Sequence, residues 1–288
     1  MSNISSISKR QLIFKIFYAS LLLFIALVVP AFLVQNFPLF DNYIYNHITK
    51  AICVGVIVII GIRLFRQRLD KGIPAGIGVN NSKTAFKYLL IGIGLILIPL
   101  LVTLVISSVF EWANFRFNFK GVLISTLFLG LISTLFTDAL SEELVFRGYI
   151  FSNLKEHYNL WISSAITLTI FVIAPVFIIT IQNSLQVDGA VALSGNYIIN
   201  MILFGAFMQY LRIIFNSIWV GVGFHLIFVH MNQLMGTTSD KLLQFSEDSN
   251  QQAVQFILMS FLVLTFLGLI IYPLIKRKKR NKKMLKTL

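Results

Sequence analysis

The sequence predicts an all-α membrane protein, a bundle of about eight transmembrane helices, and three observations support this class. Of its 288 residues, 57% are hydrophobic and only 12% are charged, whereas an average soluble domain carries about 25% charged residues. The apolar residues, which include 27 Phe, gather in runs of the roughly 20 residues that a helix needs to cross a bilayer. The basic residues gather between these runs. The chain is therefore expected to be a multi-pass membrane protein.

Each apolar run that approaches or exceeds this length predicts one transmembrane helix. In chain order the runs are 12–34, 49–66, 86–110, 121–146, 161–182, 197–214, 217–235 and 253–275. The segment "RLDKGIPAGIGVNNSKTAFK" after the second run contains Gly, Pro and Asn, which end helices, and predicts a turn-rich connector.

The distribution of Lys and Arg predicts the topology, because cytoplasmic loops carry an excess of positive charge. Basic residues precede the first run and follow the second, fourth, sixth and eighth, whereas the alternate loops are poor in them. The loop "EWANFRFNFK", with Arg116 and Lys120, departs from this pattern. We expect a protein of the cell membrane with both termini in the cytoplasm.

The formal net charge of +13 does not predict nucleic-acid binding, because the charge lies beside apolar runs and in the tail 276–288. Basic clusters next to a membrane helix face the anionic cytoplasmic leaflet. We interpret residues 1–275 as a single helical membrane domain and the tail as a topological anchor. The expected partner of this basic charge is the lipid bilayer.

One stretch interrupts this apolar pattern, "DALSEELVFRGYIF" at 138–151. Ionisable residues inside a predicted membrane helix are costly, and they are a functional-site hypothesis by default. Residues four apart share a helix face, so Glu143 is the expected ion-pair partner of Arg147. Glu142 has Asp138 on its own face and no cation, which makes it a candidate general base. The alternative is a solvated salt bridge at the end of a helix.

These residues resemble the CAAX-protease and bacteriocin-processing (CPBP, Abi) family of intramembrane proteases. "EELVFRGYI" at 142–150 resembles the family's EExxxR motif, and "NSIWVGVGFH" at 216–225 resembles its third motif, in which a Ser-hydrophobic-Trp stretch leads to a His. The resemblance covers about 140–235, within an expected CPBP-like core of about 121–235. It implies that Glu142 activates a water for peptide hydrolysis, that Glu143 and Arg147 order the helix, and that His225 polarises the water or the oxyanion.

The sequence departs from the family pattern at two positions. The second motif, FxxxH, has Pro175 in place of its His, four residues after Phe171, and Val229 stands where the third motif often has Asn or Asp. The family resemblance leaves a bound metal open. A catalytic zinc takes three protein ligands, which Glu142, His225 and Asp138 could supply only if their helices converge.

Two hypotheses of different class follow. The first is an intramembrane endopeptidase that hydrolyses a peptide or a membrane-associated protein with a carboxylate-activated water. The second is a catalytically reduced relative that serves as a membrane regulator, immunity factor or scaffold, and Pro175 and Val229 favour it. A transporter is less well supported, because no paired broken helices occur in repeated halves of the chain.

Overall fold

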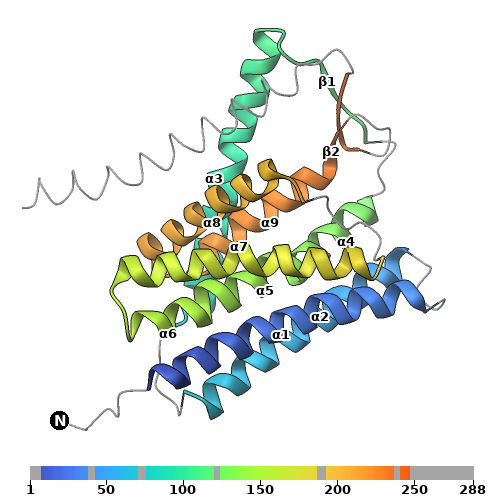
Figure 1. Ribbon diagram of the computed structural model, residues 1–288. Coiled ribbons are helices and arrows are strands. Elements are labelled where there is room, and N and C mark those ends of the chain that lie inside the picture. The colour runs from blue at the N-terminus through green and yellow to red at the C-terminus, as the bar shows by residue number, and fades with distance from the viewer. Residues whose placement is uncertain are drawn as a thin grey trace, which may run out of the picture. The chain divides into compact units, whose positions relative to one another are not determined.

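The structure is a computed structural model that describes residues 8–37, 43–70, 76–119, 124–186, 193–236 and 241–246. Helices dominate these residues, as the all-α class predicts (Figure 1). Within these residues, five helices are long and apolar enough to cross a membrane: α1 (Lys9–Asn36), α2 (Tyr43–Arg68), α3 (Ser82–Val109), α7 (Leu160–Ser184) and α8 (Gly195–Phe215). They coincide with the first, second, third, fifth and sixth predicted runs.

The number of eight membrane helices stays a prediction. The fourth run coincides with a helix that is divided into segments of different winding, from α4 (Ile124–Thr134) to α6 (Phe151–Lys155). The seventh run coincides with α9 (Trp219–Leu234), which has 16 residues. The eighth run and the basic tail 276–288 lie outside the described residues.

Polar side chains at the helix starts explain why these helices begin where they do. The Ser8 hydroxyl accepts a hydrogen bond from the Gln11 amide, and the Gln11 side chain accepts one from the Ser8 amide. Asn159 and Ser194 cap α7 and α8 in the same way, by accepting bonds from the amides three residues later. Each cap satisfies an amide that the first turn of a helix leaves without a partner.

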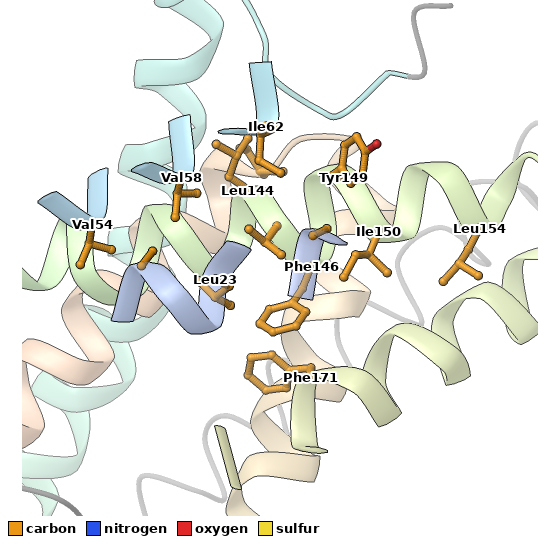
Figure 2. Close-up of a cluster of buried hydrophobic side chains, with 14 of the residues drawn as sticks. Leu23, Val54, Val58, Ile62, Leu144, Phe146, Tyr149, Ile150, Leu154 and Phe171 are labelled. Atoms are coloured by element: carbon orange, nitrogen blue, oxygen red, sulfur yellow. The ribbon is translucent and has the colours of Figure 1, made fainter. Parts of the chain in front are cut away.

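The chain forms two compact units, of which the first comprises residues 1–93 and 123–230. Its core joins α1 and α2 to the helix that carries the acidic stretch (Figure 2). Leu23 of α1 and Val58 of α2 are buried against Val145 and Phe146, and Phe146 meets the Phe171 ring of α7 edge to face at 5.3 Å. The acidic stretch is thus held from several sides by large apolar side chains.

The second unit, residues 94–122 and 231–288, contains a small sheet that the sequence analysis did not predict. The strands β1 (Phe115–Phe117) and β3 (Leu243–Phe245) pair antiparallel, and β2 (Met235–Gly236) pairs parallel with β3, giving the order β1-β3-β2. The Phe-Arg-Phe sequence of β1 alternates with a period of two, as a strand requires. It is too short to stand out among long apolar runs.

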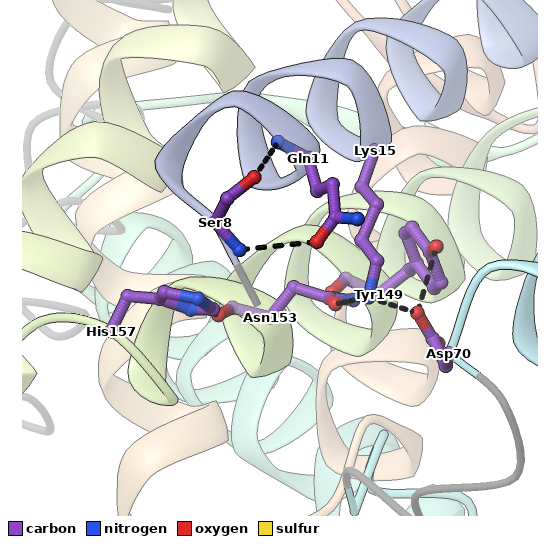
Figure 3. A network of polar contacts seen from close by, with 7 residues as sticks. All are labelled: Ser8, Gln11, Lys15, Asp70, Tyr149, Asn153 and His157. Atoms are coloured by element: carbon purple, nitrogen blue, oxygen red, sulfur yellow. Dashed lines mark hydrogen bonds and ion pairs between the residues drawn. The ribbon is translucent and has the colours of Figure 1, made fainter. Parts of the chain in front are cut away.

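A buried polar network ties the first helical hairpin to the helix of the acidic stretch (Figure 3). Lys15 of α1 lies with its Nζ 2.6 Å from Asp70 Oδ1, and both residues are only 4% exposed. The same Nζ donates to Asn153 Oδ1 at 3.2 Å, and the Tyr149 hydroxyl donates to Asp70 Oδ1 at 3.3 Å. The network fixes the position of the segment 149–153 relative to α1 and the end of α2.

Candidate functional site

The helix that carries the acidic stretch contains two π-helical segments, η2 (Leu135–Ala139) and η3 (Glu143–Ile150), separated by the single turn α5 (Leu140–Glu142). In these segments a backbone amide donates to the carbonyl five residues earlier, whereas in an α-helix it donates to the carbonyl four residues earlier. The Leu140 amide donates to the Leu135 carbonyl, and the Phe151 amide donates to the Phe146 carbonyl. Such segments are rare in proteins, and those that occur often lie at functional sites. Glu142 and Glu143, the acidic residues of the EExxxR motif, lie in or next to these wider turns.

Hydroxyl groups support the first of these π-helical segments. The Thr137 hydroxyl bonds the Ser133 carbonyl at 2.9 Å and Asp138 Oδ2 at 2.5 Å, and the Ser141 hydroxyl donates to the Thr137 carbonyl at 2.7 Å. Ser and Thr side chains that bond carbonyls of the preceding turn bend a helix. Hydroxyl residues at every fourth position, 133, 137 and 141, therefore accompany the irregular winding beside Asp138.

Glu143 and Arg147 form the ion pair that their spacing predicts. Arg147 Nη1 donates to Glu143 Oε1 at 3.0 Å, and each side chain is only 1% exposed. His225 Nδ1 lies 3.5 Å from the same Glu143 oxygen, which is the separation of an ion pair rather than of a well-formed hydrogen bond. One buried carboxylate is thus shared by the guanidinium and the imidazole. The spacing argument did not predict that Glu143 would face His225.

The guanidinium of Arg147 is held by two further contacts. Its Cζ lies 3.9 Å from the centroid of the Phe171 ring, and Nη2 donates to the Gly205 carbonyl at 3.2 Å. A desolvated cation over an aromatic face contributes about 2 kcal/mol. Gly205 allows this packing, because a Cβ there would lie 2.6 Å from the Phe171 ring. Phe171, the first residue of the degenerate second motif, therefore orders the first motif.

Glu142 and Asp138 differ from Glu143, because they remain partly exposed. Both carboxylates interact electrostatically with the imidazole of His225, and Glu142 also interacts with Asp138. This electrostatic coupling is consistent with a site shared by Glu142 and His225. Their catalytic roles stay predictions.

Tyr197 is a site residue that the sequence analysis missed. It lies in the first turn of α8, is partly exposed, and interacts electrostatically with Glu142 and Asp138. No motif includes it, and a Tyr near the end of a membrane helix is commonly an interface anchor. Only the packing of α8 against the rest of the first unit brings it to the carboxylates.

His225 is fixed by close packing of α9. It is 4% exposed, and the Phe204 ring meets its imidazole edge to face at 4.9 Å. Gly221, one turn earlier, makes room for the carboxylate, because a Cβ there would lie 2.7 Å from Glu143 Oε2. His230, later on α9, lies beside Gly130 of α4, where a Cβ would be 3.0 Å from the His230 Cε1.

Along α7, Pro175 lies at the level of Glu143, the acidic partner of Arg147. The short turn 156–159 joins the helix of the acidic stretch to α7, so the two helices run antiparallel. Phe171 packs on Arg147, and Pro175, one turn further along α7, is therefore level with the residues one turn before Arg147. The side chain where the family has a His offers neither a donor nor an acceptor here.

Among the residues that the structure describes, no three His, Cys, Asp or Glu side chains are placed to hold a metal ion. Glu143 already pairs with Arg147, and Pro175 cannot be a ligand. The zinc set considered from the sequence, Glu142, His225 and Asp138, does not assemble with metal-binding geometry in this arrangement.

The fold and the site define a helical membrane protein with a buried Arg-Glu-His cluster beside two partly exposed carboxylates. Residues 124–231 match the family described as type II CAAX prenyl endopeptidase Rce1-like. This match confirms the resemblance read from the EExxxR and third motifs. No curated protein and no solved structure matches the chain.

Proposed function

We propose that the protein is a membrane endopeptidase that hydrolyses a peptide or a membrane-associated protein with a water activated by Glu142. One observation carries the proposal: of the two adjacent glutamates, only Glu142 is partly exposed and outside the ion pair, and it interacts with His225. The family match supports the class of reaction.

In the proposed reaction Glu142 accepts a proton from the water while the water oxygen forms a bond to the peptide carbonyl carbon. The C–N bond then breaks, and the proton passes from Glu142 to the leaving amine. Glu143 faces Nδ1 of His225, and Nε2 makes no hydrogen bond to the described residues. Nε2 is therefore the ring nitrogen available to the reaction, and with both ring nitrogens protonated it donates a hydrogen bond to the developing oxyanion.

Glu143 and Arg147 support this chemistry without taking part in it. A carboxylate on one nitrogen of a catalytic imidazole fixes the orientation of the ring and the position of its proton. Arg147 in turn fixes Glu143, through a pair that is fully removed from solvent. We assign both residues as positioning residues, and Glu142 and His225 as catalytic residues.

The test compares Glu142→Gln with Glu156→Gln, a change at an exposed glutamate near the end of the same helix. Purified proteins in proteoliposomes are incubated with internally quenched synthetic peptides in ¹⁸O-labelled water. We expect cleavage by the native protein and by Glu156→Gln, with one ¹⁸O in the new carboxyl group. Loss of a general base lowers the rate by roughly 10²–10⁴, so Glu142→Gln is expected to be nearly inactive at equal abundance. Cleavage by Glu142→Gln at the native rate would contradict the proposal.

Pro175 favours a second candidate, a catalytically reduced family member that acts as a membrane regulator, immunity factor or scaffold. This function predicts that the native protein cleaves none of the peptides and that a membrane protein copurifies with it. It also predicts that Glu142→Gln leaves the cellular phenotype unchanged. Loss of that phenotype in Glu142→Gln, with cleavage detected in vitro, would exclude the second candidate.

A further inference from the structure

Arg212, near the end of α8, is a buried cation that is anchored by neutral oxygens. It is 4% exposed, and no carboxylate of the described residues lies within ion-pair distance of it. Its nitrogens donate to three separate acceptors: Nε to the Arg147 carbonyl at 3.0 Å, Nη2 to the Gly76 carbonyl at 2.8 Å, and Nη1 to Asn216 Oδ1 at 2.9 Å. A fork of rigid donors on three segments fixes their relative positions.

The carbonyl of Arg147 lies in the π-helical segment η3, where the α-helical hydrogen-bond pattern is broken. In an α-helix this carbonyl would accept from the amide of Phe151, four residues later. Here the Phe151 amide donates to the Phe146 carbonyl instead. The winding of η3 thus takes the Phe151 amide away from the Arg147 carbonyl, and Arg212 Nε donates to that carbonyl. A buried carbonyl without a partner would cost free energy comparable to a lost hydrogen bond.

Arg212 also holds the connector 76–78 against the same end of η3. The Gly76 carbonyl that it binds accepts a further hydrogen bond from the Ser152 hydroxyl at 3.3 Å. A Cβ at Gly148 would lie 3.4 Å from the Ile77 carbonyl, so the connector runs close over the Gly of the motif. The fork therefore joins α8, the connector and the π-helical segment.

The winding decides which way the glutamates point. If one π turn becomes an α turn, that turn contains one residue fewer. The chain on one side of it then rotates about the helix axis by about 100°, the angle of one residue. Glu143 pairs with Arg147 across η3 and with His225 of α9. A rotation of this size would take the carboxylate away from one or both partners.

We propose that Arg212 is a positioning residue that maintains the π-helical winding of η3, and thereby keeps Glu143 on His225 and sets the direction of Glu142. The effect on hydrolysis rests on the proposed function. The effect on the geometry does not, since it follows from the hydrogen bonds of Arg212 alone.

The variants are Arg212→Lys, which keeps the charge but cannot reach three acceptors, and Asn216→Gly, which removes one acceptor. Asn216 has φ +47°, a value that glycine adopts freely. Arg68→Lys, at an exposed arginine at the end of α2, is the matched control. The proteins are compared in nanodiscs by hydrogen exchange and by ¹⁵N NMR of the histidine rings, with the His225 signals assigned from His225→Gln.

We expect Arg212→Lys to raise amide exchange in the segment 143–151 by roughly tenfold or more, the factor for one lost hydrogen bond from a charged donor. We also expect it to shift the His225 ring signals, a change that general destabilisation does not cause. Asn216→Gly should shift the same signals by less, and it decides the question if Arg212→Lys does not fold. Native exchange and native His225 signals in both variants would overturn the proposal.

Cleavage of the quenched peptides separates this inference from the proposed function. If the native protein cleaves them, kcat should fall in Arg212→Lys while KM stays within twofold. If the native protein cleaves none, the proposed function fails, and the NMR and exchange results still decide the role of Arg212. A native kcat together with shifted His225 signals would refute only the link between winding and hydrolysis.

Discussion

The close approach of α9 to Glu143 predicts that Gly221→Ala destabilises the protein. A Cβ at this position would lie 2.7 Å from Glu143 Oε2 and 3.2 Å from its Cδ, distances well inside ordinary contact. The carboxylate cannot retreat freely, because Oε1 is held by Arg147 at 3.0 Å and faces His225 at 3.5 Å. Either the carboxylate moves and lengthens these pairs, or α9 moves.

The magnitude follows from three terms. Overpacking a buried site costs about 1–3 kcal/mol, and breaking a buried ion pair outright costs about 3–5 kcal/mol, of which a partial displacement loses a fraction. Replacing Gly by Ala inside a helix returns up to about 1 kcal/mol. We therefore expect Gly221→Ala to lower the free energy of unfolding by about 2–3 kcal/mol.

The free energy of unfolding is measured by titrating the protein with SDS in mixed micelles. Gly195→Ala is the matched control, because a Cβ at Gly195 would meet nothing within 4 Å. It should be neutral or slightly stabilising. Equal stability of Gly221→Ala and Gly195→Ala would refute the confinement of the Glu143 carboxylate, and with it the shared ion pair.

Two further predictions concern the connector 76–78 and the buried network of Lys15 and Asp70. Gly78 has φ +76°, and a Cβ there would lie 2.9 Å from Arg212 Cζ. Gly78→Ala should therefore lower the free energy of unfolding by about 2 kcal/mol or more in the same titration. Gly76→Ala is the control and should cost far less, because a Cβ at Gly76 would meet nothing within 4 Å; equal effects of the two variants would contradict this packing. Lys15→Met should cost about 3–5 kcal/mol because it leaves the Asp70 carboxylate buried without its cation, and Lys15→Met with Asp70→Asn should recover part of that loss, which a double-mutant cycle measures. Strictly additive effects of Lys15→Met and Asp70→Asn would show that the pair is not coupled.

The sequence predicts the five membrane-length helices of the described residues well, because each of them coincides with one long apolar run. It also predicts the Glu143–Arg147 pair, since neighbours four residues apart meet on α- and π-helical turns alike. The match of residues 124–231 to the Rce1-like family confirms the resemblance inferred from the motifs.

The features that the sequence does not predict depend on contacts between distant segments. The contact of Glu143 with His225 depends on how α9 packs. The need for a glycine at 221, which leaves room for the Glu143 carboxylate, can be seen only once that packing is known. Tyr197 reaches the carboxylates through α8 and belongs to no motif. The π-helical winding of η3 is stabilised by Arg212, which lies 65 residues after Arg147, so local periodicity could not predict it.

The pairing of Lys15 with Asp70 has a consequence for how the chain is assembled during synthesis. Lys15 enters the membrane with the first helix, before its acidic partner at the end of the second helix has left the ribosome. Near a helix end a lysine can reach the aqueous boundary with its amine, so the first helix can be inserted alone. Its burial at 4% exposure is then reached only after the second helix has followed, and the bonds of Lys15 to Asn153 and of Asp70 to Tyr149 form later still. The order of translation thus matches the order in which this charge can be withdrawn from water.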